Sequence, residues 1–220
     1  MIPDIDPLDQ KPVPPGARGE GFLAPATVEE ASALRFAAIS SLVLAGFEAL
    51  VALLIGSVAV MAIAIDSLRD GLSAGSALVL AGRDRRLYRL AAVIVAALTA
   101  FAFLWIVWIG FTRFGVGRLP NPWLMIAVAA ISLAVNVITA LRLRVMDVGD
   151  DDVRWTWRQT RWDFVADLGV IVAALAISDF AQRWPDLVAG LLIAAFNLWG
   201  IWKLVRAMWE AEAEDIRERS

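Results

Sequence analysis

The chain has 220 residues, of which 60% are hydrophobic and 20% are charged, and its formal net charge is −3. Soluble globular domains are usually about 45 to 50% apolar, so the composition excludes an ordinary soluble domain and indicates a membrane protein with several spans. Cysteine and histidine are both absent. Disulfides and thiolate or imidazole metal ligands are therefore excluded, and any metal site must use oxygen ligands.

Residues 1–30 predict a disordered cytoplasmic tail. This segment lacks apolar periodicity and has no basic stretch followed by an apolar run, which excludes a signal peptide. It is rich in prolines, namely Pro3, Pro7, Pro12, Pro14, Pro15 and Pro25. We expect the tail to be followed by a six-helix transmembrane domain over 31–209 and a short charged cytoplasmic tail over 210–220.

Six stretches are long and apolar enough to cross a bilayer. Spanning about 30 Å of hydrocarbon takes roughly 20 helical residues. The predicted spans lie at about 33–55, 58–81, 90–112, 122–141, 162–179 and 186–209. The expected fold class is therefore an all-α membrane protein with six transmembrane helices.

Glycines and prolines mark how these spans begin and meet. Gly56 and Ser57 leave a very short turn between the first two spans, which makes them antiparallel neighbours. Gly71 and Gly75 belong to a small-residue run in the second span that permits close helix contact. Pro122 and Pro185 lie near the starts of the fourth and sixth spans, where proline is tolerated.

The basic residues fix the expected orientation. With the N-terminus in the cytoplasm, sixteen of the twenty Lys and Arg residues fall on the cytoplasmic side, and only Arg113, Arg118 and Arg183 fall on the other. The remaining one, Arg69, lies within a span. The positive-inside rule thus places both termini in the cytoplasm, and we expect an integral protein of the inner or plasma membrane of a bacterium.

The segment at 146–160 separates the fourth and fifth spans. It combines an acidic run with Arg154, Trp155, Trp157 and Arg158. We interpret it as a solvated linker followed by an interfacial aromatic anchor. The alternative is a cytoplasmic antechamber that concentrates cations.

Two spans carry a pair of aspartates four residues apart, Asp66 with Asp70 and Asp163 with Asp167. An ionisable group inside a bilayer is costly and usually functional. A spacing of four places both carboxylates of a pair on one helix face. Asp66 lies about 12 Å from the start of its span at about 1.5 Å per residue, near the midplane. With Asp70 and Asp163 nearer the cytoplasm, the pairs are predicted to meet in the cytoplasmic half around one cation.

Salt bridging is the alternative explanation for these charges. Arg69 lies beside Asp70, and Glu48 falls in the first span. One arginine cannot neutralise five acids, so pairing alone does not explain the pattern. We expect Glu48 to pair with Arg69, with a role as a proton relay as the alternative. Four neighbouring carboxylates repel one another and favour proton uptake when no cation is bound.

Three polar residues have weaker signals. Asn136 and Asn197 fall in the fourth and sixth spans, where asparagine either lines a pathway or, more often, hydrogen-bonds a neighbouring helix. Ser67 is expected to hydrogen-bond the helix backbone or to support its neighbour Asp66 from outside the ligand set.

Three motifs resemble the cation diffusion facilitator family. Residues 56–70 are similar to its first signature, a Gly-Ser turn followed by a helix with Asp-Ser-x-x-Asp. Residues 162–170 resemble its fifth span, where His or Asp is followed four residues later by Asp. Residues 184–193 resemble the start of its sixth span. The resemblance covers about 33–209.

The resemblance implies a proton-coupled exporter of divalent metal ions that works by alternating access, commonly as a homodimer. It implies that the metal site is Asp66, Asp70, Asp163 and Asp167. Asp186 matches a recurring position that is not a transport ligand, and we expect it to complement the dipole at the start of its own helix. No cofactor beyond the transported ion is implied, and no nucleic acid.

Two departures from the family pattern shape the expectation. Members usually continue into a cytoplasmic metal-binding domain, whereas only Glu210 to Ser220 follow the last span, so we expect a dimer held by the transmembrane helices. Many zinc transporters of the family have His where this chain has Asp163. An all-oxygen site favours Mn²⁺ or Fe²⁺ slightly over Zn²⁺, Cd²⁺ or Co²⁺.

A non-transporting membrane subunit is the competing hypothesis. In that case the carboxylates of a sensor, or of a partner of another transporter, hold a structural ion or pair with Arg69. An enzyme is not expected, because the chain shows no activated nucleophile and no glycine-rich phosphate loop.

Overall fold

The computed structural model describes residues 28–80, 85–112, 119–143 and 150–218. These residues form helices joined by turns and contain no strand. The helices are α1 Val28–Ile55, α2 Val58–Val79, α3 Arg85–Thr112, α4 Pro122–Leu143, α5 Asp150–Phe180 and α6 Trp184–Glu218. The predicted count of six helices is confirmed. Of the tail predicted over 1–30, residues 1–27 lie outside the described residues, and 28–30 already belong to α1.

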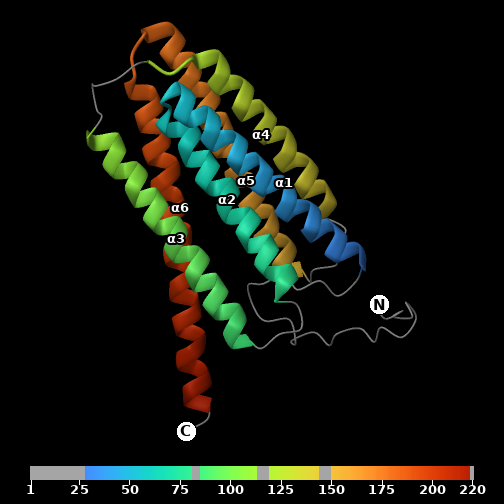
Figure 1. Cartoon of the computed structure of the whole chain (residues 1–220). Coiled ribbons are helices and arrows are strands. Elements are labelled where there is room, and N and C mark those ends of the chain that lie inside the picture. Colours follow the sequence, from blue (N-terminus) through green and yellow to red (C-terminus); the bar gives the residue numbers. More distant parts are fainter. Residues whose placement is uncertain (1–27, 81–84, 113–118, 144–149, 219–220) are drawn as a thin grey trace.

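Helix α2 is the central element of the bundle. It packs against every other helix, with α1 and α4 to one side of it and α3 and α6 to the other (Figure 1). Its first two turns are built mainly from alanine, valine and isoleucine, which are almost all buried. Small side chains let neighbouring backbones approach closely, so this sequence suits the most enclosed position.

Four of the six helices are long and apolar enough to cross a membrane by length and composition. They are α1 over Ala31–Ile55, α3 over Leu90–Thr112, α4 and the Trp184–Lys203 part of α6. Helices α2 and α5 carry more charge, since each holds one of the aspartate pairs. The packing of α2 among its neighbours keeps most of its charged face away from the surface of the bundle. The fold is an all-α, six-helix membrane domain.

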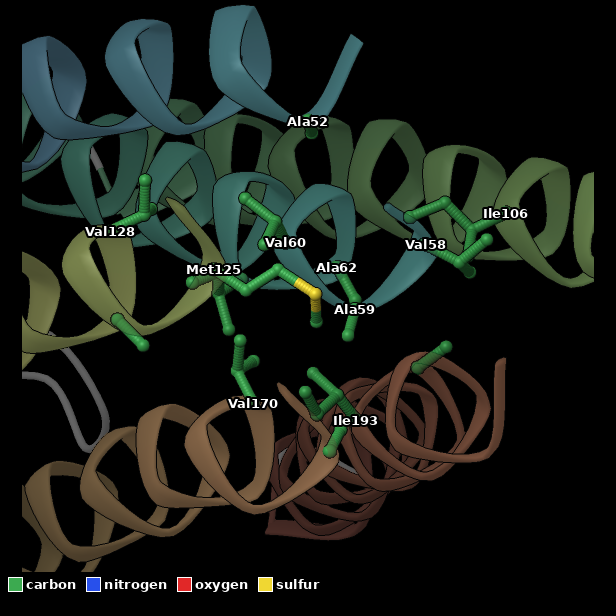
Figure 2. Close-up of a cluster of buried hydrophobic side chains, with 14 of the residues drawn as sticks. Ala52, Val58, Ala59, Val60, Ala62, Ile106, Met125, Val128, Val170 and Ile193 are labelled. Atoms are coloured by element: carbon green, nitrogen blue, oxygen red, sulfur yellow. The ribbon is translucent and has the colours of Figure 1, made fainter. Parts of the chain in front are cut away.

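The apolar core fills the half of the bundle next to the Gly56–Ser57 turn. Val60 of α2, Met125 of α4, Val170 of α5 and Ile193 of α6 point into it (Figure 2). The α2 members of this core all precede Asp66 in the sequence. On this side of Asp66, the centre of the bundle is therefore closed by close-packed side chains.

The α1–α2 turn is the short antiparallel connection that was predicted. Gly56 adopts a φ of +69°, a left-handed conformation that favours glycine. Ser57 caps α2, because its Oγ accepts a hydrogen bond of 3.1 Å from the Val60 N–H. Arg183, in the α5–α6 turn, donates a hydrogen bond of 3.0 Å from Nη2 to the Gly56 carbonyl, which joins the two turns.

Asp186 completes this junction by capping α2. Its Oδ1 accepts hydrogen bonds from Ser57 Oγ at 2.6 Å and from Ala59 N at 3.0 Å, and its Oδ2 accepts one from Val58 N at 2.9 Å. The side chain is 0% exposed. We expected this carboxylate to serve the dipole of its own helix, but its hydrogen bonds go to the N–H groups at the start of α2.

Two glycines mark the closest helix contacts. A Cβ at Gly71 would lie 2.7 Å from Leu42 Cγ of α1, and a Cβ at Gly190 of α6 would lie 2.7 Å from Val58 Cγ1. Gly75 has no such neighbour within 4 Å. The prediction of close contact through the second span is therefore confirmed at Gly71 and does not hold for Gly75.

Helices α1 and α3 begin about one turn before their predicted spans, and two other helices extend farther beyond theirs. Helix α5 begins at Asp150, so most of the predicted linker is helical. Helix α6 continues to Glu218, so the last span and most of the predicted tail form one helix, which extends past the rest of the bundle (Figure 1). Both extensions lack glycine and proline, and acidic residues at the start of α5 favour a helix N-terminus.

Candidate cation site

The four predicted aspartates border one pocket between three helices. Helix α2 supplies Asp66 and Asp70, α5 supplies Asp163 and Asp167, and α4 closes the third side. The full lining is Ile63, Asp66, Ser67, Asp70, Ser132, Asn136, Asp163, Ala166 and Asp167. The structure thus brings the two pairs together.

The antiparallel course of α2 and α5 sets two levels in this pocket. Asp66 and Asp167 are buried, next to the apolar core, whereas Asp70 and Asp163 are half-buried, one turn farther from it. Each level therefore combines one carboxylate from each helix. This arrangement follows the predicted depths, with Asp167 deeper than Asp163 and Asp70 nearer the far end of α2.

Arg69 reaches into the acidic side of α2. Its Nη2 lies 2.7 Å from Asp66 Oδ1 and 2.8 Å from Asp70 Oδ1, and its Nε donates to Asp70 Oδ1 at 3.1 Å. Its Nη1 donates to Asn197 Oδ1 of α6. The side chain is 17% exposed. One arginine therefore joins two pocket carboxylates to α6.

The expected pair between Glu48 and Arg69 does not form. Glu48 of α1 is 0% exposed, and neither of its carboxylate oxygens has a hydrogen-bond partner. Its polar neighbours are Ser67 and Ser132, both of which line the pocket. Glu48 thus lies behind the pocket, on its α1 side.

Both asparagines hydrogen-bond across helices. Asn136 Nδ2 of α4 donates to Asp167 Oδ2 at 3.1 Å, and Asn136 also lines the pocket. Asn197 accepts from Arg69 and is itself held by a 3.1 Å hydrogen bond from its Nδ2 to the Ile193 carbonyl. The more common expectation for asparagine in a span is confirmed for both.

Ser132 is a pocket residue that the sequence analysis did not select. It lies one turn before Asn136 on α4 and is buried. The sequence feature that could have identified Ser132 is its spacing of four residues from Asn136, which places two polar residues of an apolar helix on one face. Ser67 also borders the pocket, between Asp66 and the α1 side.

The carboxylates line one pocket, but they are not arranged as the coordination shell of a metal ion. Within the described residues, no group of three or more acidic side chains is placed so that it holds a metal ion. Two physical causes are present: the carboxylates repel one another, and Arg69 binds two of them. The chemistry of the lining is all-oxygen and acidic, which suits a hard or borderline cation.

A six-helix membrane domain around a buried acidic pocket defines a membrane protein that handles cations. The sequence matches the family model of the cation efflux transmembrane domain over residues 34–208. The chain belongs to this family, which confirms the resemblance found in the motifs, and the match supports a function as a metal cation exporter. No curated protein matches the chain at a significant level.

Proposed function

We propose that this protein exports a divalent metal ion by exchange for protons, with Asp66, Asp70, Asp163 and Asp167 as its transport site. The observation that carries the proposal is that all four line one pocket between α2, α4 and α5. Membership of the cation efflux family supports a metal cation as the cargo. Carboxylates one turn apart on two facing helices suit a small, highly charged ion.

The oxygen ligands of the pocket lining bear on which metal ion is bound. Zn²⁺ and Cd²⁺ bind well to imidazole and thiolate ligands, and the chain has no His and no Cys, while carboxylate oxygens suit Mn²⁺. We therefore propose Mn²⁺ or Fe²⁺ slightly ahead of Zn²⁺, Cd²⁺ and Co²⁺.

Proton exchange follows from the charge of the pocket. Four carboxylates in an enclosed site repel one another, so protons occupy some of them when no metal is bound. A divalent ion replaces that neutralisation and releases protons. Alternating access then turns the exchange into transport.

The direction of opening fits loading from the cytoplasm. The apolar core closes the bundle on the Gly56–Ser57 side of Asp66, and Asp70 and Asp163 are the more exposed carboxylates on the opposite side. With both termini in the cytoplasm, that opposite side faces the cytoplasm. We further propose a homodimer held by the transmembrane helices, in the inner or plasma membrane of a bacterium.

Flux into proteoliposomes tests the function. Mn²⁺, Fe²⁺, Zn²⁺, Cd²⁺ and Co²⁺ are compared under an imposed proton gradient, for the native sequence and for Asp163→Ala. We expect saturable flux that Asp163→Ala abolishes while the protein still folds. The matched control is Asp179→Ala, an exposed aspartate of the same helix outside the pocket, which keeps its flux.

The competing function is a membrane subunit or sensor that does not transport. The pairing of Arg69 with Asp66 and Asp70 favours it, because these carboxylates already have a partner. No flux of any ion by folded protein, or flux that ignores the proton gradient, contradicts the exchanger. Metal binding without flux then supports the sensor.

A further inference from the structure

The guanidinium of Arg69 contacts two aspartates that a metal ion in the pocket would need as ligands. The Oδ1 atoms of Asp66 and Asp70 both contact its Nη2, at 2.7 and 2.8 Å. A metal ion bound by the Asp66 and Asp70 pair shares the same carboxylates. The two cations therefore compete for one pair of side chains.

Competition with arginine differs from competition with a proton. The guanidinium stays charged at every pH at which the protein folds, so it cannot leave these carboxylates by losing its charge. It leaves only by moving. A divalent ion bound while Arg69 stays in place would meet strong repulsion over a few ångströms in an enclosed site.

Asn197 provides a second anchor for the displaced group. It already accepts from Nη1 of Arg69, and its own amide is fixed to the Ile193 carbonyl. Asn197 is buried on α6, so its hydrogen bond ties Arg69 to a second helix. A neutral acceptor there can hold the guanidinium after it has released both aspartates.

We propose that Arg69 is a tethered counter-ion that occupies Asp66 and Asp70 when the transport site is empty and is displaced toward Asn197 when metal binds. This inference depends on the proposed function of the pocket. It makes Arg69 a residue that sets metal affinity and release, because returning to the aspartates drives the metal out.

Removing the tethered charge tests the proposal. Mn²⁺ and Zn²⁺ are each titrated into the purified full chain, native and Arg69→Gln, by calorimetry and by the metal-induced rise in melting temperature. Arg69→Gln is expected to bind at least about tenfold more tightly, since a positive charge beside the ion is gone. In proteoliposomes its maximal flux falls, because release slows. Arg69→Lys, which keeps the charge, stays close to the native affinity.

A second variant is expected to change the metal affinity in the opposite direction. In the empty site Arg69 is held by Asn197 and by both aspartates, whereas after displacement Asn197 is the acceptor that remains. Asn197→Ala therefore makes displacement harder and weakens metal binding, by less than about tenfold because this hydrogen bond is present in both states. This variant keeps the inference testable if Arg69→Gln does not fold. Unchanged or tighter binding by Asn197→Ala would then overturn it.

The outcomes separate the inference from the proposed function. If the native protein neither binds nor transports any tested ion, the function of the pocket is wrong. If the native protein binds metal and loses it with Asp163→Ala, but Arg69→Gln binds equally or more weakly, the function stands. In that case Arg69 is only a structural partner of α2 and α6.

Discussion

Two groups of buried aspartates lie in the same bundle with different surroundings. Asp186 accepts three hydrogen bonds from Ser57, Val58 and Ala59 at one end of α2. In the pocket, Asp167 accepts one from Asn136, and Asp66 Oδ1 lies in a 2.7 Å ion pair with the Arg69 side chain. A carboxylate held by the backbone N–H groups of a helix start stabilises the fold, whereas one held by other side chains can exchange them for a ligand.

The same contrast separates the two halves of the bundle. Around Asp186, the turns are joined by hydrogen bonds and the core beyond them is apolar and close-packed. Around the pocket, α2, α4 and α5 meet through polar side chains. Close-packed interfaces resist gradual deformation, so we expect the first half to stay rigid and the second to rearrange when an ion binds.

The largest expected effect comes from Asp66→Asn, which keeps the shape of the side chain and removes its charge. Flux should fall by more than about 100-fold, since even indirect partners of a metal ligand cost roughly 10- to 100-fold. Stability should change little or rise, because a buried charge is removed and Arg69 keeps Asp70. Proteoliposome flux and a melting curve measure both, and native flux in this variant would remove Asp66 from the site.

The corresponding substitution in the other group, Asp186→Asn, is expected to lower stability and to leave metal binding unchanged. The amide cannot accept from all three donors, so at least one buried N–H or O–H group at the start of α2 loses its partner. The free energy of unfolding should fall by about 2 to 3 kcal/mol, while the folded fraction keeps its metal affinity. Chemical unfolding combined with metal titration tests this. Weakened metal binding at unchanged stability would contradict the assignment of Asp186 to the fold and of the pocket aspartates to the ion.

A smaller effect is expected from Gly190→Ala, which probes the rigid half alone. The new methyl group would lie 2.7 Å from Val58 Cγ1 and 2.9 Å from the Val58 carbonyl carbon, so α2 and α6 must separate slightly. Overpacking of this kind costs about 1 to 3 kcal/mol. Gly200→Ala in the same helix is the control, since nothing lies within 4 Å of its added methyl. Equal melting temperatures for the two variants would contradict the close contact.

The helices and the polar faces of α2 and α5 could be predicted because both depend on local periodicity, whereas the meeting of the two aspartate pairs was predicted from their matching depths and from the family resemblance. Apolar length marks a span, and a spacing of four fixes which side chains share a face. The extensions of α5 and α6 were missed for a related reason. Their sequences are charged or mixed, so a hydropathy pattern ends before the helix does, although no residue in them stops a helix.

Contacts between distant segments were harder to predict. Nothing in the sequence around Asp186 points to Ser57, which is 129 positions away, because its capping role depends on two turns that meet only in the folded bundle. The preferred pairing of Arg69 with Glu48 was also wrong, whereas pairing with the aspartates of its own helix had been the alternative. Glu48 has the right charge, but the neighbours of Arg69 on its own helix reach it first.

The length of α6 links the pocket to the space outside the membrane. Its 35 residues extend about 52 Å at about 1.5 Å per residue, while the hydrocarbon layer is about 30 Å thick. Asn197, which holds Arg69, lies partway along this helix. After Pro185, α6 contains no further proline, the residue that most often kinks a helix. The residue that holds Arg69 and the projecting end of the molecule therefore belong to one continuous helix.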